Sequence, residues 1–130
     1  MRYLLDTDTV SFGLRGQGEV AARLRKHRPS DVSISSITLA ELRYGADRKG
    51  SRKLHALIDT FTGAVDVAAF DEHAAREFGR IGSILADRGT PIGEFDVLIA
   101  AHAVALRSTL VTNNIRHFSR VPGLAVENWL

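Results

Sequence analysis

The chain has 130 residues, of which 45% are apolar and 25% charged, and its formal net charge is only +2. This composition fits one soluble globular domain covering residues 1–130 and excludes a disordered or fibrous protein. The absence of cysteine excludes disulfide bonds, thiolate catalysis and cysteine-based zinc sites, so oxygen or imidazole must hold any metal.

In chain order, the first half predicts a strand at 2–5, a helix through Val20 and Leu24 that stops before Pro29, a strand at 32–34, and helices at 39–46 and 54–61. The second strand is indicated by Val32 and Ile34, which alternate with serines. The last of these helices has apolar residues at helical spacing and is expected to end at Gly63.

The second half predicts a strand at 65–67, helices at 74–85 and 95–107, a strand at 109–112, and a short strand within 124–129. Residues 95–107 are apolar on most sides, which is typical of a buried helix. Because parallel strands need crossover connections, this alternation predicts an α/β sandwich with a mainly parallel central sheet.

The opening segment is too short for a signal peptide or a membrane span, so a cytoplasmic protein without a membrane partner is expected.

Acidic residues come from three separate segments that a parallel sheet brings to one edge. Asp6 directly follows the first strand, Glu41 lies early in the helix after the second strand, and Asp96 lies in the first turn of the apolar helix. Ligands of open parallel sheets collect at the carboxyl ends of the strands. Asn113 and Asn114 follow the late strand at the equivalent place.

Each acid also has a purely structural interpretation. Thr38 and Glu41 fit the spacing of a capping box, Asp96 is placed to complement a helix dipole, and Asp6 is placed to cap the segment after it. However, Glu41 and Asp96 stand among apolar neighbours, where a carboxylate is costly unless it is paired or binds a metal. Clustered carboxylates prefer a hard cation, so Mg²⁺, or alternatively Mn²⁺, and hydrolysis of phosphodiesters are expected.

Four segments resemble the motifs of VapC-type PIN-domain toxins. They are Leu4-Leu5-Asp6-Thr7, Ser36 to Leu42, Gly93 to Ala101, and an ending that runs from Val111-Thr112-Asn113-Asn114 through Phe118 to Leu124. The likeness follows the family's order along nearly the whole chain. The resemblance implies a PIN-like α/β/α fold and a magnesium-dependent endoribonuclease that is the toxin of a type II toxin–antitoxin pair.

The resemblance also assigns residues and partners. It makes Asp6, Glu41 and Asp96 the catalytic, metal-binding acids, and it adds Asn114 as a metal contact through water. The implied partners are an RNA substrate, a VapB-like antitoxin and a second copy of the chain, while DNA is reached only through the antitoxin. Candidate contacts with the second copy are Phe12, Leu14 or Tyr44.

The sequence departs from the family at one position of the site. A carboxylate often precedes the last phenylalanine, where this chain has His117, which its neighbours Arg116 and Arg120 indicate to be a surface histidine. A degenerate PIN module that binds RNA or antitoxin without cleavage therefore stays open. The enzymatic alternative is a haloacid-dehalogenase-like phosphatase, which the spacing of Asp6 and Asp8 permits but the lack of any lysine after Lys53 disfavours.

Overall fold

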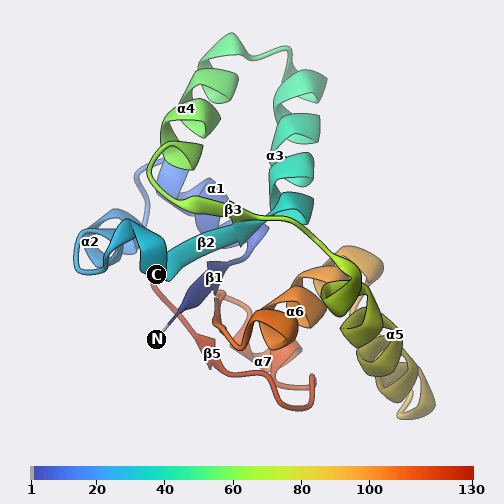
Figure 1. The fold of residues 1–130 in the computed structure, drawn as a ribbon. Coiled ribbons are helices and arrows are strands. Elements are labelled where there is room, and N and C mark those ends of the chain that lie inside the picture. The colour runs from blue at the N-terminus through green and yellow to red at the C-terminus, as the bar shows by residue number, and fades with distance from the viewer. Residues whose placement is uncertain (1) are drawn as a thin grey trace.

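The computed structural model describes residues 2–130, which form a parallel sheet with helices on both faces (Figure 1). Its five strands lie in the order β3-β2-β1-β4-β5, and every neighbouring pair is parallel. Their bounds are β1 Tyr3–Leu5, β2 Val32–Ser35, β3 Asp66–Ala68, β4 Thr109–Val111 and β5 Val126–Glu127. The predicted α/β sandwich is confirmed, and its sheet is parallel throughout the described residues.

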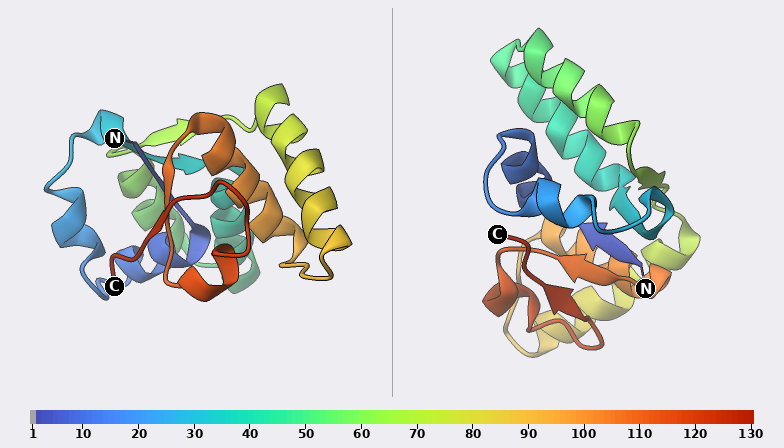
Figure 2. Two further views of the ribbon diagram at one scale, coloured as in Figure 1. Left: turned by 90° about the horizontal axis from the view of Figure 1, so that it is seen from below. Right: turned by 90° about the vertical axis from the view of Figure 1, so that its left-hand side faces the viewer.

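The α-helices of the described chain connect these strands. Their bounds are α1 Thr7–Leu14, α2 Val20–Leu24, α3 Ser36–Lys49, α4 Arg52–Thr62, α5 Glu72–Asp87, α6 Glu94–Leu106 and α7 Ile115–Phe118. In Figure 1, α3 and α4 form a hairpin that projects from the sheet, and α5 packs beside α6. The views in Figure 2 show the sheet and the helices on its two faces from below and from the side.

The pleat of the strands separates two hydrophobic cores. Leu4 and Leu110 belong to the core between the sheet and α5, α6 and α7. Leu5 and Val111, one position further along the same strands, belong to the core formed with α1 to α4. Because side chains alternate between the faces of a strand, neighbouring residues bury on opposite sides of the sheet. Both faces of β1 and β4 are therefore covered, which explains their uninterrupted apolar sequences.

Some helix limits differ from those the sequence predicts. The helix at 39–46 begins already at Ser36, because Ser35 caps it by accepting a hydrogen bond from the Ile37 backbone N–H (3.0 Å). Helix α1 was not predicted at all, since its apolar residues Val10, Phe12 and Leu14 recur every second position. Such spacing lacks the helical period, and the cap supplied by Asp6 starts this helix.

Candidate active site

The three predicted acids lie in three segments at the carboxyl end of the sheet. These are the residue after β1, the helix that follows β2, and the start of the helix that leads into β4. Asp6 is the residue after β1, Glu41 is the sixth residue of α3, and Asp96 is in the first turn of α6. Burial raises the pKa of Glu41, and the charges of Asp96 and Asp6 raise it further. The structure therefore brings Glu41 within electrostatic reach of both other acids.

Asp6 is the most buried of the three, with only 5% of its surface exposed. Its Oδ1 accepts a hydrogen bond from the Thr9 backbone N–H (2.8 Å), which makes Asp6 the N-cap of α1, and the Thr112 hydroxyl also donates to its carboxylate. Burial nevertheless raises the pKa of Asp6 above its ordinary value, and the charge of Asp8 adds to the rise. Asp6 thus caps a helix and keeps a carboxylate at the site.

Glu41 is partly buried, and a threonine holds it from the opposite side of the site. Thr7 Oγ1 lies 2.7 Å from Glu41 Oε1 and donates to it, while the same hydroxyl lies 3.2 Å from Thr38 Oγ1. Burial raises the pKa of Glu41, and the charges of the neighbouring acids raise it further. The capping-box interpretation of Thr38 and Glu41 is wrong, because the cap of α3 is three residues earlier.

Asp96 is bound by an imidazole. His117 Nε2 lies 3.0 Å from Asp96 Oδ2 and 2.9 Å from the Ile92 carbonyl oxygen, so this nitrogen carries a hydrogen that both acceptors share. Burial raises the pKa of Asp96, and the contact with His117 opposes that rise. The interpretation of His117 as a surface histidine is wrong, since its side chain is 22% exposed and orients a carboxylate of the site.

The charge of Asp8 at the site was not predicted, nor was the backbone contact that Asn114 makes. Asp8 is exposed in the first turn of α1, and its charge raises the pKa of Asp6, Glu41 and Asp96 alike. Asn114 is exposed at the start of α7, and its backbone N–H donates to Thr112 Oγ1 (3.0 Å). Asn114 is thus linked to Asp6 through Thr112, and its assignment as a metal contact stays a prediction.

The donor set of the site fits a hard divalent cation. Carboxylate and hydroxyl oxygens are the ligands that Mg²⁺ and Mn²⁺ prefer. Among residues 2–130, however, no three acidic or histidine side chains are close enough to form a complete ligand group. Asp6, Glu41 and Asp96 are each held by their own hydrogen-bond donor while their charges repel, so the carboxylates must converge to share an ion.

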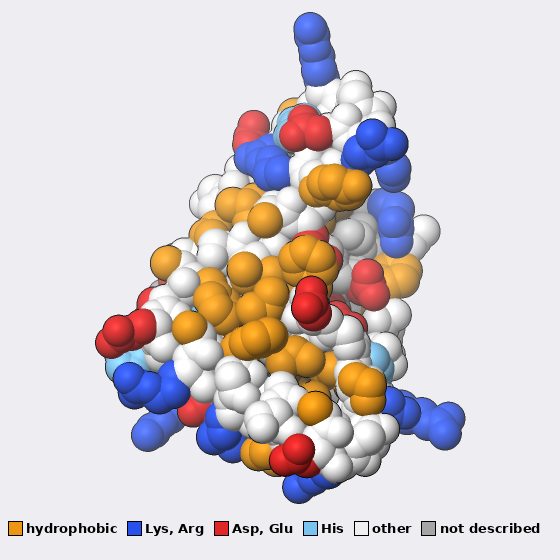
Figure 3. Space-filling model, turned by 90° about the vertical axis from the view of Figure 1, so that its right-hand side faces the viewer, with side chains coloured by type: hydrophobic (Ala, Val, Ile, Leu, Met, Phe, Trp, Pro, Cys, Tyr) orange, Lys and Arg blue, Asp and Glu red, His pale blue; other side chains and the backbone are white. Residues whose placement is uncertain are grey.

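A groove between α3 and α6 borders the acids. A cavity of about 520 Å³ is lined by Ala40, Glu41, Tyr44 and Phe95, and both aromatic rings are more than half exposed. On the face shown in Figure 3, apolar side chains gather in the middle, with acidic side chains beside them. The site therefore opens next to an apolar surface.

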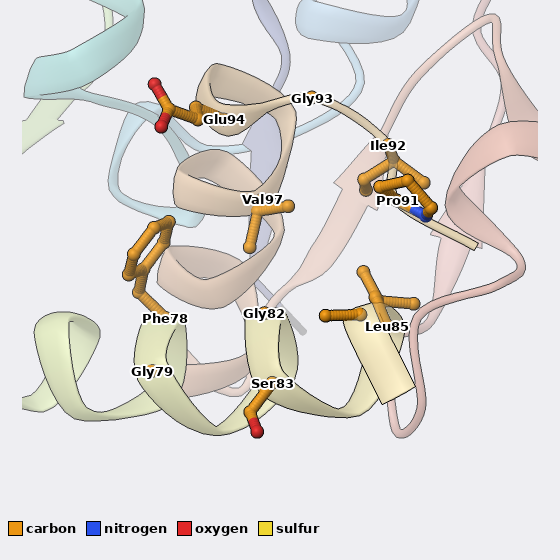
Figure 4. A pocket seen from close by; sticks show the side chains of 11 residues that line it. Phe78, Gly79, Gly82, Ser83, Leu85, Pro91, Ile92, Gly93, Glu94 and Val97 are labelled. Atoms are coloured by element: carbon orange, nitrogen blue, oxygen red, sulfur yellow. The ribbon is translucent and has the colours of Figure 1, made fainter. Parts of the chain in front are cut away.

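A second groove, of about 360 Å³, lies between α5 and the segment that leads into α6 (Figure 4). Figure 4 shows Phe78, Leu85 and Val97 around this space, whereas the three acids do not line it. It is thus an apolar packing feature apart from the acids.

Of the described helices, none is long and apolar enough to cross a membrane.

Known proteins match this chain over nearly its full length. The PIN domain model matches residues 3–124. A tRNA(fMet)-specific endonuclease VapC of Salmonella typhimurium is 37% identical over 99% of this chain and 98% of its own length. Ribonuclease VapC2 of Rickettsia felis is 35% identical over the same shares of the two chains.

Solved structures agree with these matches. The DNA-bound VapBC structure from Salmonella typhimurium aligns with a TM-score of 0.94 and 36% identity, covering 100% of this chain and 99% of the other. VapBC2 from Rickettsia felis bound to a promoter DNA fragment aligns with a TM-score of 0.92 and 34% identity, covering 100% of both chains. PIN-domain ribonucleases generally depend on a divalent metal. The chain belongs to the PIN-domain family and, within it, to the VapC ribonucleases.

Proposed function

We propose that this protein, as one PIN domain spanning residues 1–130, is a Mg²⁺-dependent endoribonuclease that acts as the toxin of a type II toxin–antitoxin pair. The observation that carries the proposal is the group formed by Asp6, Glu41 and Asp96, whose pKa values are all raised at one edge of the sheet. Crowded carboxylates without a lysine or arginine partner are suited to bind a cation, and Mn²⁺ is expected to replace Mg²⁺.

In the mechanism, Asp6 and Asp96 would be the principal metal ligands. Glu41 would either complete the ligand set or accept the proton of the attacking water, and Asn114 would contact the metal through water. A divalent cation held there would supply a water of lowered pKa and neutralise charge on the phosphate. Thr7 donates a hydrogen bond to Glu41 and His117 donates one to Asp96, so each of these carboxylates has a donor that orients one of its oxygens.

The substrate that we propose is RNA, because the matched relatives are ribonucleases and one is a tRNA endonuclease. Cleavage hydrolyses a phosphodiester bond within the strand. The comparisons favour neither the phosphatase nor the non-catalytic module. The phosphatase interpretation also requires a late lysine, and the last lysine of the chain is Lys53.

We further propose a VapB-like antitoxin as the protein partner and a homodimer as the assembly, in the cytoplasm. Two of the matched structures are VapBC complexes with DNA, so contact with DNA is expected only through the antitoxin. The acidic site is complementary to an arginine side chain of the antitoxin. If it is plugged in this way, raising Mg²⁺ weakens inhibition more than Na⁺ at matched ionic strength.

Cleavage of a mixed RNA pool by purified variants tests the proposal. Asp6→Asn and Asp96→Asn each remove one negative charge with little change in volume, so cleavage in Mg²⁺ and growth inhibition should be lost. Asp66→Asn is the matched control, because Asp66 is an exposed acid of β3 that does not contribute to the pKa shifts of the site. Parental cleavage rates in either site variant, or cleavage by the parent in EDTA, would contradict the proposal.

A further inference from the structure

Helices α3 and α6 carry Glu41 and Asp96, and a buried polar contact joins the two helices away from these acids. His102 of α6 is 1% exposed, and its Nδ1 lies 2.8 Å from the hydroxyl oxygen of Ser35. Ser35 is fully buried and is the N-cap of α3. The contact therefore links the start of one site-bearing helix directly to the other.

The hydrogen bonds around His102 define its tautomer. The ring also makes a hydrogen bond with the backbone of Ala69, and we assign the hydrogen of the neutral ring to Nε2. Nδ1 of the neutral ring is then an acceptor, so the Ser35 hydroxyl donates to it. The oxygen of Ser35 in turn accepts from the Ile37 backbone N–H (3.0 Å). Every polar atom of this buried group has a defined partner.

The adjoining loop is fixed at the same point. The Phe70 backbone N–H donates to Ser36 Oγ (3.0 Å), and the Phe70 ring meets the His102 ring edge-on with centroids 5.3 Å apart. The ends of β2 and β3, the start of α3 and the middle of α6 thus converge on one imidazole. A rotation of His102 cannot occur without moving several of these elements, because the ring is enclosed.

The spacing along the two helices connects this contact to the acids. Glu41 is six positions after Ser35, and His102 is six positions after Asp96. Each offset corresponds to a rise of about 9 Å along its helix. The helices run past one another with Ser35 against His102 at one end and with Glu41 and Asp96 in electrostatic contact at the other. In Figure 1, the lower end of α3 lies above α6.

We infer that His102 is a positioning residue, which through Ser35 fixes α6 against α3 and thereby sets the separation of Glu41 and Asp96. The two carboxylates repel, so the pair moves apart when the contact at the other end is lost. A metal site tolerates misplacement of only about 0.5 Å, so a small shift of α6 weakens metal binding. This inference rests on the proposed function, because it assumes that the acids share a cation.

The primary test compares two serine caps. Ser35→Ala and Ser51→Ala each remove an N-cap hydroxyl, since Ser51 accepts from the Leu54 backbone N–H at 3.0 Å and caps α4. Only Ser35 contacts His102. We expect Ser35→Ala to raise the Kd of Mn²⁺, measured by calorimetry on the protein without RNA, by about tenfold or more. Ser51→Ala should also lose stability in urea, since α4 loses its cap, but should keep the parental Kd.

Variants of His102 provide the second test. His102→Leu removes the contact with Ser35 and fills the space of the ring with an apolar side chain. It should therefore weaken Mn²⁺ binding and lower kcat more than it changes KM for RNA. His102→Asn places an amide near the position of Nδ1 and should recover most of the Mn²⁺ affinity. Val20→Ala is the control for general destabilisation, because Val20 is fully buried in α2, within the other core.

Parental Mn²⁺ affinity in folded Ser35→Ala and His102→Leu would overturn the inference, because a purely structural role lowers stability alone. If both variants fail to fold, parental affinity in His102→Gln, which displaces the group facing Ser35, would overturn it equally. Asp96→Asn separates the two proposals. If Asp96→Asn loses Mn²⁺ binding while Ser35→Ala keeps the parental Mn²⁺ affinity, only the positioning role is rejected. If Asp96→Asn retains Mn²⁺ binding, the proposed metal site itself is rejected.

Discussion

Asp6 has two roles that substitution can separate, because it caps α1 and also adds a negative charge to a crowded site. Asp6→Asn keeps an oxygen that accepts from the Thr9 N–H, whereas Asp6→Ala loses it. Loss of an N-cap costs about 1 kcal/mol, or roughly 4 °C in Tm for a domain of this size. Both substitutions remove a buried charge whose pKa is raised by burial, so Asp6→Asn should be more stable than the parent in EDTA.

Saturating metal should reverse that order. A ligand present at a hundred times its Kd stabilises the folded state by about 2.7 kcal/mol, and only the parent keeps all three carboxylates to bind it. With Mn²⁺ the parent should therefore become more stable than Asp6→Asn, while neither Asp6 variant gains comparably. Urea unfolding followed by circular dichroism, in EDTA and in Mn²⁺, gives the four differences needed.

Three results would refute parts of this reasoning. If Asp6→Asn is less stable than the parent in EDTA, charge crowding does not destabilise the metal-free protein. If Asp6→Asn and Asp6→Ala are equally stable, the hydrogen bond to Thr9 does not contribute as a cap. If Mn²⁺ stabilises Asp6→Asn as much as the parent, Asp6 is not a metal ligand.

The remaining predictions concern pH, a close backbone contact and His117. The pKa values of the three acids are raised in the folded state, so the metal-free protein should gain stability as the pH falls from neutral through those values. The affinity for Mn²⁺ should fall over the same pH range. Urea titrations check the stability, and calorimetry checks the affinity. Gly18→Ala should destabilise the folded protein in urea by about 1–3 kcal/mol more than Gly16→Ala. Both glycines have positive φ, but of the two only Gly18 would place a Cβ against Leu130, at 2.6 Å from Cδ2 and 3.1 Å from Cα. His117→Gln should retain the donor to Asp96 and most of the cleavage rate, whereas His117→Leu should lose about tenfold or more in Mn²⁺ affinity, and equal affinities in calorimetry would contradict the orienting role.

The position of the acids was predictable because it follows from chain topology. Once Asp6 ends a buried strand and the strands are parallel, its side chain must lie at the same edge as the helices that follow the neighbouring strands. Glu41 is in the second turn of the helix that follows β2, and Asp96 is in the first turn of the helix that leads into β4, so both begin at this edge of the sheet and their approach required no knowledge of side-chain packing. Their apolar neighbours supplied the further signal that these carboxylates are not ordinary surface acids.

The contacts that orient the acids were not predictable in the same way. His117 reaches Asp96 because α7 folds back over the segment containing Ile92, and the sequence around His117 shows only neighbouring arginines. The capping box failed for a related reason, since Ser35, Ser36 and Thr38 all have the side chain of a cap and only packing decides where the helix begins. Local patterns name the residue types but leave the choice among them to tertiary structure.

The donors that hold the acids explain why the site keeps its negative charge. Two threonine hydroxyls and a backbone N–H orient Asp6 and Glu41, and none of these groups is charged. Among the described ion pairs, none joins either residue to lysine or arginine, and Asp96 has only an imidazole. A guanidinium would lower the raised pKa values and stabilise the metal-free protein, but it would also compete with the cation. The repulsion that weakens the fold is therefore the same interaction that leaves the carboxylates ready for a metal ion.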